Sequence, residues 1–171
     1  TTDASYQGSE GIREEFEKYS NILSNFKMVE EKKIIEKLFQ EINTNSGLGS
    51  YGLKEVIEML RNNIAAMVVI SDDINMSRIE KKCKRCSHVE EELIEQGKRI
   101  ARKTEMKSQR CSECEAMDFE MTDQDLIDFI ALIASQTGTK VEVVSGKTEH
   151  GVMLGSLGNI AAILRYNPNR G

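Results

Sequence analysis

Four cysteines in two pairs are the residues of this sequence whose types and spacing can do chemistry. The pairs lie in Cys83-Lys84-Arg85-Cys86 and Cys111-Ser112-Glu113-Cys114. Each Cys-x-x-Cys places two sulfur atoms about one ion width apart on a tight turn, and two such turns facing each other form the tetrahedral site that Zn²⁺ prefers. The spacer between the pairs is a little longer than usual for this pattern, which leaves room for a loop. We therefore predict a structural Zn²⁺ site formed by Cys83, Cys86, Cys111 and Cys114.

Other chemistries of four cysteines fit the sequence less well. Disulfides are typical of secreted proteins, whereas this chain opens on Thr-Thr-Asp-Ala-Ser without signal-peptide features and is rich in Lys and Glu, which favours a reducing cytoplasm. A thioredoxin-like redox pair requires one Cys-x-x-Cys beside a βαβ unit rather than two matched pairs. An iron–sulfur cluster uses the same four ligands and stays open as an alternative, although no other pattern indicates electron transfer.

Charge is distributed unevenly along the 171 residues, whose net charge is −5. Between Arg78 and Arg110 there are eleven Lys and Arg against six Asp and Glu, so this segment carries +5 and the remainder −10. The segment is predicted to be a basic appendage on an acidic body, either close to RNA phosphate or simply holding the thiols deprotonated. The candidate patch consists of Lys81, Lys82, Lys84 and Arg85. No run of 18 apolar residues occurs, so no membrane segment is expected.

No catalytic constellation is visible, and we expect no enzyme activity. His88 and His150 are the only histidines, and neither lies in a pattern with a nucleophile and an acid. His88 is a possible substitute zinc ligand, but four cysteines already complete the shell. The Gly-x-Gly-x-x-Gly match at 47–52 follows a predicted helix rather than a strand, so dinucleotide binding is not expected.

Alternating helix and strand patterns surround the cysteine segment and must position it. The continuous apolar run at 65–70 indicates a central strand buried on both faces. Thr122 to Asp125 matches a capping box before a buried helix that Gly138 ends. The sequence therefore predicts a layered α/β sandwich with a mixed sheet and a small inserted zinc-binding minidomain. Helices are predicted over 11–23, 28–42, 53–62, 126–137 and 149–157, and further strands over 140–144 and 160–166.

The cysteine segment itself has weaker patterns. Charged residues dominate 78–83, which predicts an exposed hairpin arm carrying the metal site. Apolar residues in 89–106 are too sparse to indicate an element.

Several stretches of the body resemble the C-terminal domain of the archaeal and eukaryotic class-1 peptide chain release factor. They are Leu23-Ser24-Asn25-Phe26-Lys27 leading into Glu30-Glu31-Lys32-Lys33-Ile34-Ile35, Tyr51-Gly52 before Val56, and the closing run Ile160-Ala161-Ala162-Ile163-Leu164-Arg165-Tyr166. The resemblance implies that 1–25 end a preceding central domain, as a fragment starting at Thr1 suggests. It also implies that 26–171 form the third domain, with 76–118 as the insert.

The same resemblance implies a docking domain that acts on the ribosome at stop codons. The Gly-Gly-Gln tripeptide and the decoding motifs of the family are absent, so neither peptidyl-tRNA hydrolysis nor codon reading is expected. The implied partners are a translational GTPase of the elongation-factor type, the ribosome-recycling ATPase and, near the insert, small-subunit RNA. Paired cysteines in the insert resemble the archaeal members. The residues expected to support GTPase docking are Ile163, Leu164, Arg165 and Tyr166.

Three alternatives remain at this point. The paralogous ribosome-rescue factor has a similar third domain but typically lacks the cysteine insert. A zinc-ribbon RNA-binding module fused to an α/β domain is the second alternative. A metalloenzyme is the third and the weakest, because a closed four-thiolate shell leaves no position for water.

Overall fold

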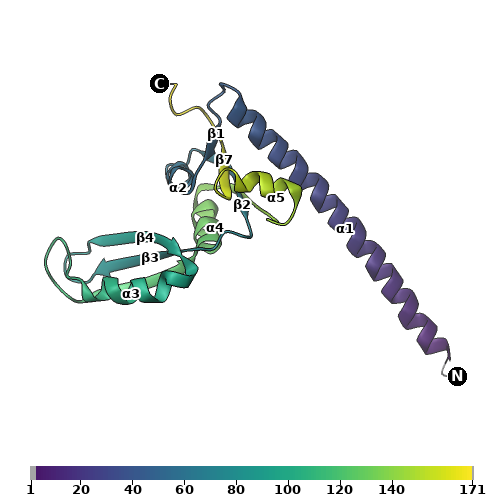
Figure 1. The fold of residues 1–171 in the computed structure, drawn as a ribbon, viewed down its shortest axis with the longest axis horizontal. Coiled ribbons are helices and arrows are strands. Elements are labelled where there is room, and N and C mark those ends of the chain that lie inside the picture. Colours follow the sequence, from purple (N-terminus) through teal and green to yellow (C-terminus); the bar gives the residue numbers. More distant parts are fainter. Residues whose placement is uncertain (1–2, 171) are drawn as a thin grey trace.

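A mixed four-stranded sheet covered by helices forms the body of the molecule, and an antiparallel three-stranded sheet projects from it (Figure 1). The computed structural model describes residues 3–170. In chain order the elements are α1 (Asp3–Asn43), β1 (Gly49–Tyr51), α2 (Leu53–Arg61), β2 (Ala65–Ser71), β3 (Met76–Cys83), β4 (Val89–Glu95), the 3-10 helix η1 (Gln96–Lys98), α3 (Arg99–Ser108), β5 (Phe119–Asp125), α4 (Leu126–Thr137), β6 (Lys140–Val144), α5 (Glu149–Gly155) and β7 (Ile160–Leu164).

Strand β2 lies inside the four-stranded sheet, whose order is β1-β7-β2-β6. It pairs in parallel with β6 and antiparallel with β7, so the sheet is mixed. Val68, Val69 and Ile70 are all 0% exposed, because both faces of the sheet are covered. The predicted buried central strand over 65–70 is confirmed.

Helices cover the sheet on both faces. Because successive side chains of a strand point to opposite faces, Val68 and Ile70 pack with α2 and α4, whereas Val69 packs with α1 and α5. Ile35 of α1 and Leu154 of α5, which pack on the same face as Val69, are both 0% exposed. The predicted layered α/β architecture with a mixed sheet is therefore confirmed, with the second sheet as an addition.

Helix α1 is continuous, whereas the sequence predicted two helices separated at Ser24-Asn25. Ser and Asn are only mildly unfavourable inside a helix, and no Pro interrupts this one. Its N-terminal half extends away from the body (purple in Figure 1), and Phe16 and Leu23 are exposed there. Despite its length, α1 is too polar to cross a membrane, and no other helix in residues 3–170 qualifies.

Two residues fix the ends of α4. The Asp125 side chain accepts a hydrogen bond from the Ile127 N–H at 2.8 Å, a cap that contributes about 1 kcal/mol. Gly138 ends the helix in the left-handed region at φ 66°, as predicted. The predicted capping box is correct only for Asp125, because the residues from Thr122 to Gln124 complete β5 instead.

The second sheet has the order β4-β3-β5, so β3 is its central strand rather than one arm of an exposed hairpin. Strand β5 pairs with the edge of β3 that β4 leaves open, and α3 packs on one face. Ile79 and Cys83 are buried as a result. The segment without a clear pattern, 89–106, forms β4, η1 and most of α3, and β5 extends the sheet beyond residue 118 to Asp125.

Charged side chains join this second sheet to the body. Glu91 of β4 accepts hydrogen bonds from Arg61 of α2 at 2.7 Å and from Arg78 of β3 at 2.6 Å. Both guanidinium groups lie near the ring of Phe129 in α4, at 5.5 and 4.5 Å from its centroid. Cation–π contact and the shared carboxylate therefore connect the β3–β4 hairpin to α2 and α4 of the body.

Candidate metal centre

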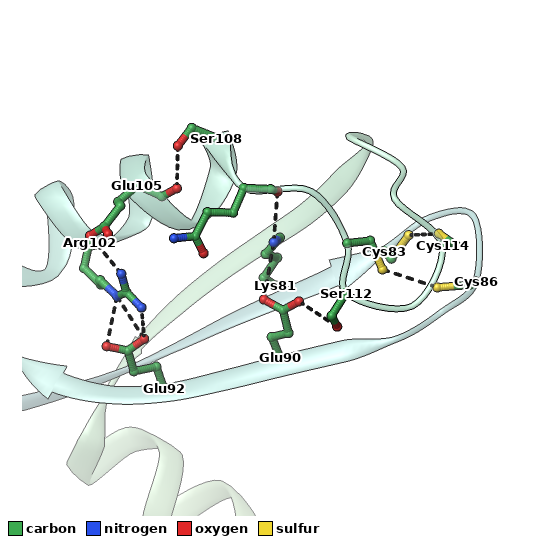
Figure 2. Close-up of polar contacts among 12 residues, drawn as sticks. Lys81, Cys83, Cys86, Glu90, Glu92, Arg102, Glu105, Ser108, Ser112 and Cys114 are labelled. Atoms are coloured by element: carbon green, nitrogen blue, oxygen red, sulfur yellow. Dashed lines mark hydrogen bonds and ion pairs between the residues drawn. The ribbon is translucent and has the colours of Figure 1, made fainter.

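The four cysteines come together at the end of the second sheet that lies away from α4. One pair begins at Cys83, the last residue of β3, and the other lies in the loop between α3 and β5. Their sulfur atoms all lie within 4.8 Å of one another. The closest approaches are Cys83 to Cys114 at 3.5 Å and Cys86 to Cys111 at 3.6 Å (Figure 2). A disulfide requires about 2.05 Å, so all four are free thiols.

The two cysteine turns have the same backbone geometry. In the first turn, the Cys83 N–H donates to the His88 carbonyl at 2.8 Å and the Ser87 N–H donates to the Cys83 carbonyl at 2.9 Å. Ser87 has a positive φ of 61°. The second turn repeats all three features. The Cys111 N–H donates to the Ala116 carbonyl and the Glu115 N–H donates to the Cys111 carbonyl, both at 2.9 Å, and Glu115 has a φ of 58°.

This arrangement can hold a metal ion. Four sulfurs at 2.3 Å from a tetrahedral ion are about 3.8 Å apart, and the observed separations of 3.5 Å to at most 4.8 Å bracket that distance. Cys83 and Cys111 are 1% and 2% exposed, so the site is shielded on one side. His88 contributes its carbonyl to the first turn, and its imidazole is not among the clustered donor atoms.

The backbone of the first turn prepares one thiol for ionisation. Backbone hydrogen bonds from Cys86 and Arg85 lower the pKa of Cys83 to about 6. At Cys86 the backbone of His88 acts in the same direction, but hydrogen bonding among the neighbouring thiols raises its pKa. A thiolate is the form that binds a metal, so the backbone donors of the first turn favour the metal-binding form of Cys83.

The four residues of the predicted basic patch have different surroundings in the structure. Lys81 is 2% exposed and points under α3, where its Nζ lies 3.3 Å from Glu90. Lys84 is exposed but pairs with Asp118 at 2.9 Å. Lys82 and Arg85 alone are both exposed and without an ion pair among the described residues.

Two cations that the candidate patch omitted lie in the same region. Lys107 and Arg110 are exposed, and neither makes an ion pair within residues 3–170. Arg110 directly precedes Cys111, and Lys107 lies in the last turn of α3. Their closeness to the second cysteine pair in sequence was the signal available. The unpaired positive charge of the segment thus gathers at its cysteine end, on Lys82, Arg85, Lys107 and Arg110.

The predicted docking run also divides into buried and exposed parts. Ile163 and Leu164 are 7% and 6% exposed within β7, so their side chains belong to the core. Arg165 is exposed and donates to the Thr137 carbonyl at 3.0 Å. Tyr166 is 54% exposed. Only the last two side chains are accessible to a partner.

Comparison with known proteins gives consistent matches. Residues 28–168 match the family model described as eRF1 domain 3. Peptide chain release factor subunit 1 of Methanobrevibacter smithii is 35% identical over 168 residues, which are 98% of this chain and 40% of that protein. The protein of the same name from Methanocaldococcus jannaschii is 30% identical, with coverages of 97% and 40%. The chain thus spans about 40% of the length of these curated relatives.

Solved structures show the same fold. The C-terminal domain of a peptide chain release factor from Methanosarcina mazei superposes with a TM-score of 0.79 at 24% identity, covering 93% of this chain and 96% of that one. Archaeoglobus fulgidus Pelota gives a TM-score of 0.55 at 21% identity, covering 87% and 33%.

Proposed function

The chain belongs to the eRF1 domain 3 family, the C-terminal domain of archaeal peptide chain release factor subunit 1. From that premise we propose that it is the partner-docking domain of a factor acting on the ribosome at stop codons. The observation that carries the proposal is the family match across residues 28–168, which includes the body and the cysteine segment. Curated release factors at 30 and 35% identity support this assignment over the ribosome-rescue alternative. The proposed compartment is the cytoplasm, where ribosomes act.

The domain is proposed to recruit partners without catalysing the reaction. The Gly-Gly-Gln tripeptide expected at the hydrolysis centre is absent from the chain. Its partners are a translational GTPase of the elongation-factor type and the ribosome-recycling ATPase, as the family resemblance implies. Arg165 and Tyr166, the exposed end of the closing run, are the proposed contact with the GTPase.

Residues 1–25 are proposed to belong with the preceding domain, and 26–171 to form the third domain with its insert at 76–118. The match to domain 3 starts at residue 28, whereas the alignment to full release factors takes in 97% of the chain. Exposed apolar side chains recur every three or four residues along the first half of α1, which suits a helix that packs on a neighbouring domain. They are Ile12, Phe16, Tyr19, Leu23 and Phe26.

The metal proposed for the four-cysteine cluster is Zn²⁺. Its soft, all-sulfur donor set, its near-tetrahedral separations and its two matched turns support structural zinc. A bound ion would hold the two turns together. All four positions of a tetrahedral shell would be taken by sulfur, so the role is structural rather than catalytic.

The cysteine end of the insert is proposed to lie against small-subunit RNA. The four unpaired cations there supply a charge that a phosphate backbone can neutralise, whereas the remaining cations of the segment are mostly engaged with carboxylates. An appendage of this sign on an acidic body favours orienting the insert toward nucleic acid.

Two measurements test the docking function. Calorimetric titration of the chain with an archaeal elongation-type GTPase should give one-to-one binding. The chain alone should release no peptide from ribosomes programmed with a stop codon. Absence of binding contradicts the docking role, and measurable peptide release contradicts the non-catalytic one.

A further inference from the structure

Lys81 is a buried cation in an insert whose side chains are mostly exposed or partly exposed. It is the largest of the fully buried side chains in the described part of the chain. Burying an ammonium is costly unless it is paired, so such a residue needs specific partners. Its Nζ lies 3.3 Å from Glu90 Oε2 and donates to the Gln109 carbonyl at 3.2 Å. It also lies 4.1 Å from the centroid of the Phe119 ring.

These partners come from the segments that carry the two cysteine pairs. Lys81 lies on β3, which ends in Cys83 and so leads into the first turn. Gln109 caps α3 and lies two residues before Cys111, where the second turn begins. The ammonium therefore connects the strand that bears one pair to the backbone that leads into the other (Figure 2).

Glu90 extends the connection into the second turn. Its Oε2 pairs with Lys81, and its Oε1 accepts from the Ser112 hydroxyl at 3.5 Å. Ser112 lies between the two cysteines of the second pair. The chain Lys81, Glu90, Ser112 thus runs from the centre of the sheet to the cluster, as Figure 2 shows.

We propose that Lys81 is a positioning residue of the metal centre: it docks the second cysteine turn against the first through Gln109 and Glu90. The inference rests on the proposed zinc site. It assigns a function to a lysine that the sequence placed in a surface patch.

The test compares zinc affinity in three versions of the chain. Zn²⁺ dissociation constants are measured by competition with a chromophoric chelator for wild type, Lys81→Met and Lys107→Met. Removing a side chain that supports metal ligands weakens binding about 10- to 100-fold, and this is expected for Lys81→Met. Lys107→Met removes an exposed, unpaired cation of the same segment, so its affinity should stay within about twofold of wild type.

A second measurement separates positioning from simple support of the fold. Lys81→Met alone leaves the Glu90 carboxylate without its partner, so stability is compared in the double variant Lys81→Met, Glu90→Gln, which removes both charges. Without metal, this double variant should unfold at no lower temperature than metal-free wild type. The Co²⁺-loaded variant should keep a sulfur-to-metal charge-transfer band, reached at a higher metal concentration. The positioning role is overturned if the free energy of unfolding without metal falls by as much as the free energy of zinc binding. It is also overturned if Lys81→Met binds zinc with wild-type affinity.

Glu90→Gln covers the case in which Lys81→Met does not fold. This change keeps the size of the side chain and removes its charge, and it should weaken zinc binding severalfold. Unchanged zinc affinity in Glu90→Gln then overturns the proposal. Failure of wild type to bind zinc, by contrast, removes the proposed metal centre itself and is recognised before any variant is examined.

Discussion

Ser87 and Glu115 occupy the same position in the two cysteine turns, each four residues after the first cysteine of its pair. Both have a left-handed backbone, at φ 61° and 58°, and each donates its N–H to the carbonyl of that cysteine at 2.9 Å. A positive φ is uncommon for residues other than Gly. Its occurrence at both positions shows that the fold of the turn, rather than the residue type, sets this conformation.

Substitution at Ser87 should follow the cost of a positive φ. Ser87→Gly relieves the backbone and should leave zinc binding intact. Ser87→Val places a β-branched residue in the left-handed region and should destabilise the metal-loaded insert by about 1–2 kcal/mol. Denaturant unfolding of the zinc-loaded chain measures the difference. Equal stability of the Gly and Val variants would contradict this interpretation of the turn.

Zinc content should be about one ion per chain and should depend on all four sulfurs. Atomic emission on protein purified without chelator should find this stoichiometry, and Ser at any of Cys83, Cys86, Cys111 or Cys114 should abolish it. Glu113→Gln, in the second turn but not a ligand, is the matched control and should keep the metal. The α/β body should still unfold cooperatively in the cysteine variants, because the buried residues of its two core clusters all lie outside the insert.

Acid should weaken the joint between insert and body, which is formed by Glu91, Arg61, Arg78 and Phe129. Partial burial acts to raise the pKa of Glu91, but hydrogen bonds from Arg61 and Arg78 outweigh it and lower that pKa below its ordinary value. The unfolded chain therefore binds the proton more tightly, so the stabilisation is present at neutral pH and is lost as the pH falls from about 4.5 through the lowered folded value.

Glu91→Gln tests this joint directly. The variant should be less stable than wild type at pH 7 and should show a smaller loss of stability between pH 6 and pH 3. Thermal unfolding across that range gives both quantities. A matched Glu105→Gln variant on the solvent side of α3 should retain the wild-type pH dependence around the joint. If Glu91→Gln and wild type lose stability in parallel, the joint does not contribute.

GTPase binding should depend on the exposed end of the closing run. Arg165→Glu reverses a charge at the proposed contact and should weaken GTPase binding about tenfold in calorimetry. Tyr166→Ala should weaken it as well, since it removes a half-exposed aromatic side chain. Lys107→Glu, on the insert, is the control and should bind normally. Wild-type affinity in Arg165→Glu, with the fold intact by circular dichroism, refutes the proposed contact.

RNA binding should be carried by the unpaired cations at the cysteine end. Substituting Ala for Arg85 or Arg110 should weaken binding to small ribosomal subunits and lower the salt dependence by about one unit of slope for each phosphate that is no longer neutralised. Lys84→Ala should have less effect, because this side chain already pairs with Asp118. Identical salt slopes for wild type and the double variant Arg85→Ala, Arg110→Ala contradict the proposed RNA binding.

Local sequence determined the parts of this protein whose signals are short range. The spacing of the cysteines predicted the cluster, because a Cys-x-x-Cys turn fixes two sulfurs by itself. The apolar run at 65–70 predicted a central strand, and Gly138 predicted the end of α4 through its tolerance of positive φ. The family resemblance, read from motifs in the body, is confirmed by the match over 28–168.

Only the tertiary structure decided what surrounds the cysteines. Strand β5 is mostly polar and has no local strand signal, yet its pairing with β3 turns a predicted exposed arm into the centre of a sheet. That pairing, together with α3, buries Lys81, which sequence placed on the surface. Likewise Leu164 belongs to the core because helices cover both faces of its sheet. Burial depends on which distant segments pack together, and the spacing of residues within one segment does not predict those contacts.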